Sequence, residues 1–303
     1  MPVQSIIPAS LRILIAGHMQ VTAAHNRTPA RVLAVSSQVV YGPVGNSAAV
    51  PGMQKLGLEV LALPTVLLSN HPGHGSPVRQ VIAAETMKAM LERVADHGWL
   101  DGLAGVMTGY FADAAQVEVT AEAIVRLKDA DPDLLYVCDP ILGDDDPGLY
   151  VPEEVARAIG SRLVPLADVI TPNRFELAWL AGAEVTGPAS AVQPARSLAP
   201  RCLATSVPAS EGRLATMLIG SDTVWVVETP RRAQVPHGTG DLLSGLFLAH
   251  LAGGREGREA LALSLGAVEA VLDASQGSDA LDLAAIPSLP GKRLSVQPLE
   301  VRS

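Results

Sequence analysis

Short apolar segments alternate along this chain with longer segments in which apolar residues recur every three or four positions. The apolar segments, which we interpret as strands, cover 31–37, 58–69, 103–109, 134–140 and 168–171. The periodic segments, which we interpret as helices, cover 46–56, 77–97, the region around 117–125, 152–163 and a stretch that begins at 175. A strand–helix–strand order of this kind predicts a mainly parallel sheet with helices on both faces.

The pattern changes after residue 201. CLATSV (202–207), ATMLIG (215–220) and TVWVVE (223–228) read as strands with no helix between them, which predicts an antiparallel edge of the sheet. Two helices at 241–252 and 255–273 follow. We therefore predict a three-layer α/β/α fold with a mainly parallel central sheet and an antiparallel edge. We expect a single domain over 31–290, preceded by a loose extension at 1–30 and followed by a tail at 291–303.

Composition and charge exclude several classes of protein. The chain has 303 residues, of which 48% are hydrophobic, and two cysteines, so neither disorder nor a disulfide scaffold is expected. Cys138 and Cys202 lie in or at apolar segments, which predicts reduced core thiols of a cytoplasmic protein. With 22 basic and 31 acidic residues the net charge is −9, so nucleic acid is not an expected partner. No apolar stretch reaches the ~20 residues of a membrane span, so no membrane partner is expected either.

Polar residues follow several of the predicted strands. In an open parallel sheet, ligands bind beyond the carboxyl ends of the strands. The residues at these positions are Ser36, Ser37, Ser69, Asn70, His71, Thr108, Tyr110, Asp139, Thr171, Asn173, Glu176, Thr205 and Ser206. Each of them alone is equally typical of a helix cap or a turn. Together they favour one shared polar site.

The most informative segment is HGTGDLLSG, residues 237–245. Gly238 and Gly240 precede a helix that is apolar on nearly every side, which predicts a buried helix. The free N–H groups at the start of such a helix bind anions, and glycine lets a phosphate approach the backbone. Asp241 would then lie beside a transferring phosphoryl group. The alternative is simple capping of the helix by Asp241 or Thr239.

Other motifs of catalysis and metal binding are missing from the sequence. The chain has no G-x-x-x-x-G-K-[ST] loop, no G-x-G-x-x-G fingerprint and no G-x-S-x-G elbow. His71 and His74 are close enough to suggest a metal site, but no third ligand lies near them in the sequence. We therefore expect them to be ordinary loop histidines.

At the level of motifs, the chain from about residue 32 to about 275 resembles the pyridoxal kinases of the ribokinase-like superfamily. The motifs that carry the resemblance are VSSQVVYGPVGNSAA (35–49), VLLSNHPGHG (66–75), TGY (108–110), YVCDPILGDD (136–145), LYVPE (149–153), DVITPNRFELAWLAG (168–182) and GTGDLLSG (238–245). The last motif alone would indicate only a ribokinase-like kinase. The serine run with VVYGPVGN, joined to SNH and CDPILGD, is more particular to the pyridoxal branch.

The resemblance implies ATP-dependent phosphorylation of the 5′-hydroxyl of pyridoxal. It makes Asp241 the catalytic base, and it makes Gly238, Thr239 and Gly240 the donors that hold the γ-phosphate. It assigns Mg²⁺ to Asp139 and Glu176, with a monovalent cation such as K⁺ as a further candidate. The nucleotide side would comprise Asp139, Asp144, Thr171, Asn173, Thr205, Ser206 and Gly240. The substrate side would comprise Ser37, Val66, Pro72, Tyr110, Tyr150 and Asp241. A homodimer is also expected from the resemblance.

The chain departs from the family pattern only on the substrate side. Pro72 stands where a threonine is usual, Leu67 and Leu68 replace a glutamine–phenylalanine pair, and Gln38 replaces a common histidine. Kinase chemistry is therefore better supported than the identity of the substrate. One alternative is a kinase of hydroxymethylpyrimidine or another small alcohol. The other is a protein that binds B6 vitamers with little turnover, although a pure binder would need no phosphate-binding turn.

Overall fold

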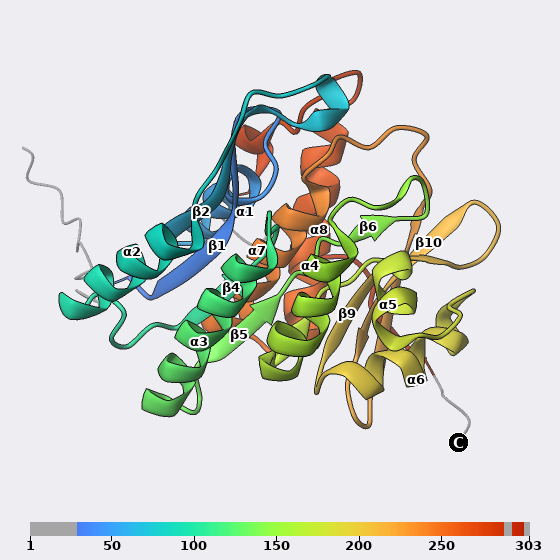
Figure 1. Ribbon diagram of the computed structural model, residues 1–303. Coiled ribbons are helices and arrows are strands. Elements are labelled where there is room, and N and C mark those ends of the chain that lie inside the picture. Colours follow the sequence, from blue (N-terminus) through green and yellow to red (C-terminus); the bar gives the residue numbers. More distant parts are fainter. Residues whose placement is uncertain (1–28, 288–292, 300–303) are drawn as a thin grey trace, which may run out of the picture.

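A computed structural model describes residues 29–287 and 293–299, and within them ten strands form one central sheet (Figure 1). In spatial order the strands are β12 (Gln297–Pro298), β11 (Val224–Pro230), β10 (Arg213–Ile219), β9 (Cys202–Pro208), β8 (Val169–Ile170), β5 (Leu135–Cys138), β4 (Gly105–Thr108), β1 (Arg31–Tyr41), β2 (Glu59–Asn70) and β3 (Arg79–Val81). The strands from β9 through β8, β5, β4 and β1 to β2 are parallel, whereas β10, β11 and β12 at one edge and β3 at the other are antiparallel. The predicted mainly parallel sheet with an antiparallel edge is confirmed.

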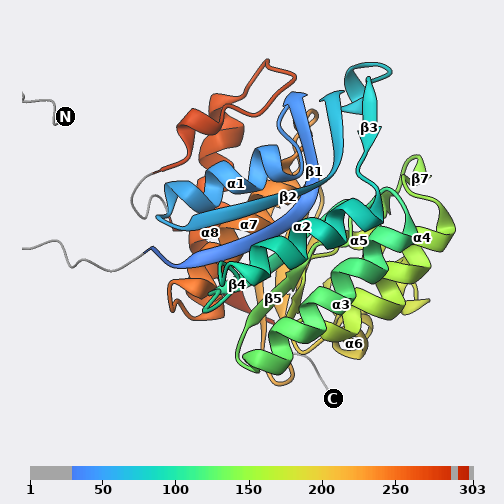
Figure 2. The same ribbon diagram turned by 60° about the vertical axis from the view of Figure 1, so that its left-hand side comes forward.

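Helices cover both faces of this sheet (Figures 1 and 2). One face carries α1 (Asn46–Lys55), α7 (Thr239–Ala252) and α8 (Gly257–Ala274). The other carries α2 (Ala84–Asp96), α3 (Ala114–Ala130), α4 (Glu153–Ala158), α5 (Arg174–Ala181) and α6 (Pro188–Leu198). Alternate residues of β1 enter the two cores, because side chains of a strand point to opposite faces. Val32 and Ala34 pack toward α7, and Leu33 and Val35 pack toward α3.

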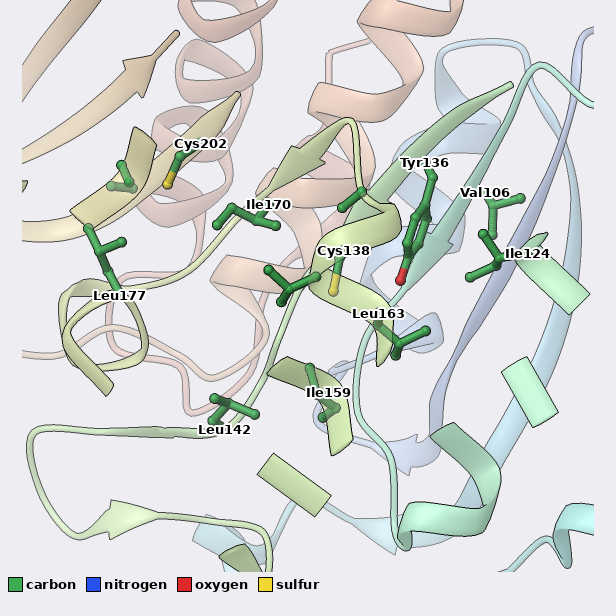
Figure 3. Close-up of a cluster of buried hydrophobic side chains, with 14 of the residues drawn as sticks. Val106, Ile124, Tyr136, Cys138, Leu142, Ile159, Leu163, Ile170, Leu177 and Cys202 are labelled. Carbon is green, nitrogen blue, oxygen red and sulfur yellow. The ribbon is translucent and has the colours of Figure 1, made fainter. Parts of the chain in front are cut away.

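Figure 3 shows part of the larger core, where side chains from β4, β5, α3 and the turn after α4 meet. Tyr136 is fully buried there, and its hydroxyl lies 2.7 Å from Thr108 Oγ1, so its one polar atom is satisfied. Cys138 and Cys202 are both buried free thiols, as the sequence predicted. Burial raises the pKa of the Cys138 thiol to about 12, which makes this thiol unreactive.

One predicted helix is in fact a strand followed by a helix. We expected 77–97 to be helical throughout, but Arg79–Val81 forms β3 and the helix begins at Ala84. β3 pairs with β2 through Val81–Val66, Gln80–Leu67 and Arg79–Leu68. Pairing with the free edge of β2 therefore outweighed the helical periodicity from which we had assigned this segment to the helix. This extra strand lengthens the lobe that carries the turn η1 (Pro72–His74).

A small hairpin and three short helical turns complete the described chain. The hairpin pairs β6 (Gly143–Asp144) with β7 (Gly148–Leu149) immediately after β5. The predicted helix at 152–163 is helical as expected, with α4 continuing into the turns η2 (Ile159–Leu163) and η3 (Val164–Leu166). A last turn, η4 (Leu283–Ala285), follows α8.

The ends of the chain bear on the predicted domain bounds. The predicted extension lies outside the described residues up to position 28, and so do 288–292 and 300–303 of the C-terminal part. Residues 293–299 of the predicted tail pack on the domain, because they supply β12 and the buried Val296. Within the described ranges, no helix is long and apolar enough to cross a membrane.

Candidate active site

The carboxyl ends of the parallel strands bring the predicted polar residues to one edge of the sheet. Asp139 follows β5 and Thr171 follows β8, whereas Ser37 lies inside β1, at the irregularity between Ser36 and Gln38 where its pairing with β2 shifts; all three side chains are buried. The N-terminus of α7 joins them, because the Ser244 hydroxyl of α7 contacts both Asp139 and Thr171. The sequence therefore predicted correctly that several strand ends share one polar environment.

The turn before α7 is open for an anion. Gly238 has φ +91°, and a Cβ on it would come within 2.0 Å of the Pro43 carbonyl oxygen, so only glycine fits. No side chain of the described residues caps α7, and the Thr239 hydroxyl instead donates back to the Pro236 carbonyl at 2.9 Å. A Cβ on Gly240 would meet no described atom within 4 Å. Thr239 therefore does not cap α7, whereas the Asp241 carboxyl lies against its own N–H group, and no described side chain fills the space beside Gly240.

Asp241 is buried directly behind this turn. Its Oδ1 atom has no hydrogen-bond partner among the described residues. Burial raises the pKa of this carboxyl to about 6, while the N–H groups of Gly45 and of Asp241 itself limit the rise. A base with a pKa near neutrality is well matched to proton transfer at physiological pH.

Gly45 connects Asp241 to Ser37 of β1. It has φ +55°, and a Cβ there would lie 2.3 Å from Ser37 Oγ. A side chain is thus excluded at the point where the start of α1 meets β1 and Asp241. This backbone N–H was not predicted from the sequence, because its approach to Asp241 depends on the packing of α1 against α7.

A second carboxylate, Asp139, is held by a chain of hydroxyl groups. Ser244 Oγ donates to Asp139 Oδ2 at 2.8 Å, and Thr171 Oγ1 lies 2.8 Å from Ser244 Oγ. Burial and the charges of Asp241 and Glu176 raise the pKa of Asp139 well above its usual range. Sequence analysis did not identify Ser244. The available signal was its position three residues after Asp241, which places both on one face of α7.

The third carboxylate, Glu176, is held by the backbone. It forms a capping box with Asn173 at the start of α5, in which Glu176 Oε2 accepts from the Asn173 N–H at 2.9 Å. Its other oxygen, Oε1, accepts from the Leu142 N–H at 2.7 Å, and the Asn173 amide donates to the Gly143 carbonyl at 2.7 Å. Burial raises the pKa of Glu176 to about 7, although these donors oppose the rise. Both residues thus tie the loop after β5 to α5.

Asp139, Glu176 and Asp241 are buried, and within the described ranges none of them forms an ion pair, so a cation would be a favourable ligand here. Within 29–287 and 293–299, no group of three or more His, Cys, Asp or Glu side chains is arranged as a ready-made metal site. Mg²⁺ does not need one, since it is commonly bound through one or two carboxylates, waters and substrate phosphates. The buried charge of Asp139 and the unpartnered Oδ1 of Asp241 fit such an ion, whose remaining ligands would come from a nucleotide and water.

The hairpin and the edge of β9 border this polar region. The Tyr150 N–H donates to the Leu142 carbonyl at 2.7 Å, and Leu142 in turn donates to Glu176, so Tyr150 lies at the Glu176 end of the site. Burial and the charges of Asp144 and Glu176 raise the pKa of Tyr150 to about 12. Asp144 itself is exposed on β6. The Thr205 N–H donates to the Pro172 carbonyl at 2.9 Å, and Ser206 has φ +57°.

On the other side lie the residues predicted to contact a substrate ring. The Tyr110 N–H donates to Ser36 Oγ at 3.1 Å, which joins the segment after β4 to the middle of β1. Pro72 is exposed in η1. Val66 has no exposed surface and forms part of the interior of β2, so the structure does not present it to the site.

Beside the turn before α7 lies a cavity of about 290 Å³ that the sequence did not reveal. Its walls come from two segments, Arg232–Pro236 before α7 and Leu272–Ser278 at the end of α8, with members Arg232, Ala233, Gln234, Pro236, Leu272, Ser275, Gln276, Gly277 and Ser278. The Arg232 guanidinium is held by Glu269 at 2.6 Å and Asp273 at 2.7 Å. The two segments are far apart in the sequence and form a cavity only through tertiary packing, so no local sequence pattern predicts it.

The chain is similar to known small-molecule kinases over most of its length. The family model described as phosphomethylpyrimidine kinase matches residues 45–280. A protein of Rubrobacter xylanophilus named pyridoxal kinase PdxY is 40% identical over 250 residues, which are 80% of this chain and 86% of that protein. A protein of the same name from Leifsonia xyli subsp. xyli is 33% identical, covering 85% of this chain and 94% of its own length. The pyridoxal kinase of Leishmania donovani in complex with ADP and pyridoxine superposes with a TM-score of 0.83 at 29% identity, over 89% of this chain and 99% of that chain.

Proposed function

This chain belongs to the pyridoxal kinase family of the ribokinase-like superfamily, and from this membership we propose that it transfers the γ-phosphoryl group of ATP to the 5′-hydroxyl of pyridoxal. The observation that carries the mechanism is the uncapped start of α7 with the buried Asp241 behind it. Phosphoryl transfer needs positioning, charge neutralisation and one base, and this turn supplies all three kinds of group in one place.

We assign the proton transfer to Asp241. Its carboxylate accepts the proton of the 5′-hydroxyl while the hydroxyl oxygen bonds to the γ-phosphorus, and the bond from that phosphorus to the bridging oxygen of ADP breaks. The N–H groups at Gly238, Thr239 and Gly240 hold the phosphoryl oxygens as negative charge shifts onto the leaving group. The dipole of α7 points its positive end at the same oxygens.

Mg²⁺ is the proposed metal, and Asp139 and Glu176 are the residues assigned to it. When bound, the ion neutralises charge on the phosphates and on the cluster of buried carboxylates. Ser244 and Thr171 keep the Asp139 oxygens oriented toward that region. Because both oxygens of Glu176 accept backbone N–H groups, we expect Glu176 to act on the ion through its charge and through water.

We place the nucleotide between the turn before α7 and the end of α8. The cavity of about 290 Å³ adjoins Pro236, two residues before the first glycine of the turn, so it lies within reach of a base whose phosphates are held at α7. Thr205, Ser206 and Asn173 would border the sugar and the phosphates, and Asp144 would cover them from the hairpin. A monovalent cation such as K⁺ remains a candidate for the same region.

We place the ring of the substrate on the β1–β2 side of Asp241. Ser37 would donate to the pyridine nitrogen, and Tyr110 and Pro72 would line the ring. Tyr150 would approach from the hairpin, and Val66 would support the floor from inside β2.

We further propose a homodimer in which the lobe of β1, β2 and β3 meets its copy. Four large apolar side chains are exposed on this lobe, namely Val40 (89%), Val78 (80%), Tyr41 (53%) and Leu67 (43%). The lobe also ends in the short edge strand β3, and exposed apolar edges commonly mark association surfaces. Light scattering after size exclusion should give the mass of two chains, and Val78→Glu should shift it toward one.

A second substrate class is supported by the matching family model, which is described as phosphomethylpyrimidine kinase. One experiment distinguishes the candidates. ATP consumption is measured with pyridoxal, pyridoxine, pyridoxamine and hydroxymethylpyrimidine under the same conditions. We expect the largest kcat/KM with a B6 vitamer. The largest value with the pyrimidine would transfer the assignment to that substrate, and binding without turnover of any of them would indicate a vitamer-binding protein.

A further inference from the structure

Three histidines that are separated in sequence meet between the substrate lobe and the turn before α7. The rings of His71 and His237 stack with their centroids 3.9 Å apart and an interplanar angle of 29°. His74 lies edge-on to both, at 6.3 Å from His71 and 6.4 Å from His237. We call these three residues the histidine clasp.

The clasp joins segment 71–75 to the turn before α7, and the mechanism requires these two segments to lie close together. His71 caps η1, where its Nδ1 atom accepts the Gly73 N–H at 3.1 Å, and His237 immediately precedes Gly238. Contact between the two segments is tight, because a Cβ on Gly73 would lie 2.6 Å from His237 Nε2. His74 adds a second connection through its Nε2 atom, 3.1 Å from the Asp279 carbonyl oxygen.

We propose that His71 and His237 are positioning residues, whose stacked rings hold the substrate-covering segment 71–75 against the phosphate-binding turn 238–241. This inference rests on the proposed function, since it gives segment 71–75 a substrate to cover. In the closed arrangement the 5′-hydroxyl of the substrate stays near Asp241, and loss of the stack releases the lobe from the turn. The effect falls on binding of the vitamer and not on binding of ATP.

The stack holds best when both rings are neutral. Burial, and then the neighbouring His237 and His74, lower the pKa of His71 to about 4, and burial and His74 lower that of His237. The other titratable groups around the clasp are Tyr41 and Asp279, which hydrogen-bond each other at 2.9 Å behind His74. Because both histidine pKa values are lowered, the stack is intact above pH 6.5 and is lost as the pH falls toward 4.

The test compares removal of the stack with replacement of its ring. His237→Ala should raise the KM for pyridoxal by about twofold to tenfold, the range of one aromatic pair, with the KM for ATP within twofold. His237→Phe keeps an aromatic face and should recover most of that loss. His97→Ala is the matched control, because it breaks a stacked pair of the same kind, His97–Trp99 at 4.5 Å, at the end of α2 and outside the site.

A double-mutant cycle then tests the contact itself. If the rings stack, the effects of His71→Ala and His237→Ala on the KM for pyridoxal overlap in the double variant, and their effects on the free energy of unfolding overlap too. Calorimetric affinity for pyridoxal should stay nearly constant from pH 7.5 to 6 and weaken more between pH 6 and 4 in the wild type than in His237→Phe.

Two results would overturn the clasp. They are a phenylalanine variant as impaired as the alanine variant, or fully independent effects in the cycle. Failure of the proposed function has a different signature, because the wild type would then not phosphorylate pyridoxal at all. The unfolding cycle measures the stack even in that case.

Discussion

At the scale of single residues, the chemistry depends on how burial sets the charge of three carboxylates. Asp241 titrates near pH 6, whereas an aspartate in water titrates near 4, because its surroundings penalise the charged form. Its raised pKa means that the carboxylate, which is the form able to accept a proton, is lost as the pH falls through 6. The same environment leaves Oδ1 free for the substrate hydroxyl.

The pH dependence of kcat/KM for pyridoxal follows from this. We expect kcat/KM to be constant from pH 7 to 8 and to fall by about tenfold for each pH unit below 6, once the ionisation of pyridoxal itself is corrected for. Initial rates between pH 5 and 8 provide the measurement. A profile that stays flat to pH 5 would show that Asp241 has the pKa of an exposed carboxyl or that it is not the base.

Replacing Glu176 separates its charge from its structural role. Glu176→Gln should raise the Mg²⁺ concentration for half-maximal activity, because a neutral amide replaces a carboxylate near the ion. The amide NH₂ would also meet a backbone donor, so stability should fall. Asp113→Asn is the control, since Asp113 caps α3 by accepting from the Gln116 N–H at 2.9 Å outside the site. An unchanged Mg²⁺ titration for Glu176→Gln would leave only the capping role.

At the scale of elements, the segments that the sequence described best are those whose pattern is set locally. Five of the six parallel strands (β1, β2, β4, β5 and β8) and α7 follow directly from apolar runs and from the glycines at 238 and 240, whereas β9, expected in the antiparallel edge, pairs in parallel with β8. Strand β3 was missed because its pairing with β2 overrode the helical periodicity of 77–97. Helix α6 was missed because its alanines, serines and prolines give little apolar contrast, although Pro188 stands at its first turn.

The turn η1 carries a prediction of its own. Pro72 occupies its first position and has no N–H to offer a substrate. Pro72→Thr should lower the KM for pyridoxal by about threefold to tenfold, the range of one neutral hydrogen bond, with little change in the KM for ATP.

The matched control for Pro72→Thr is Pro77→Thr in the same lobe, which reports the effect of losing a proline's stiffness alone. If both threonine variants raise the KM for pyridoxal equally, stiffness and not a missing donor is the property of Pro72 that matters. A change confined to the KM for ATP would place η1 on the nucleotide side.

At the scale of the whole molecule, the site lowers the stability of the empty protein. Carboxyl groups whose pKa is raised in the folded state favour folding below their ordinary pKa, and that contribution is lost as the pH rises through the raised value. Asp139, Glu176 and Asp241 all have raised pKa values. We therefore expect Asp241→Asn to melt about 2 °C above the wild type at pH 8 without ligands, a shift corresponding to roughly 1 kcal/mol.

That difference should shrink toward pH 5, where the wild-type carboxyl is already protonated, and in the presence of Mg²⁺ and ATP, which supply positive charge. Differential scanning calorimetry at both pH values provides the comparison. A variant that melts below the wild type at pH 8 would show that Asp241 stabilises the empty site.

Some parts of the site could be predicted from the sequence and others could not. The polar residues at strand ends and the turn at 238–241 could be assigned to one site because parallel strands end at one edge. Ser244, the N–H of Gly45, the cavity beside Pro236 and the contact of His237 with His71 could not be, because each depends on how segments far apart in the chain pack. His71 and His74 were expected to be unremarkable loop residues, and the partner that gives them a common position is His237.

The most direct test of the central claim, that Asp241 is the base of an ATP-dependent pyridoxal kinase, is a single-turnover measurement with Asp241→Asn. The amide keeps the size of the side chain but cannot accept the proton, so formation of pyridoxal 5′-phosphate should slow by about 10²- to 10⁴-fold. Binding of ATP and of pyridoxal, measured on the same variant, should stay within a few fold of the wild type. A single-turnover rate near that of the wild type would contradict the account, because the proton would then leave the hydroxyl without Asp241.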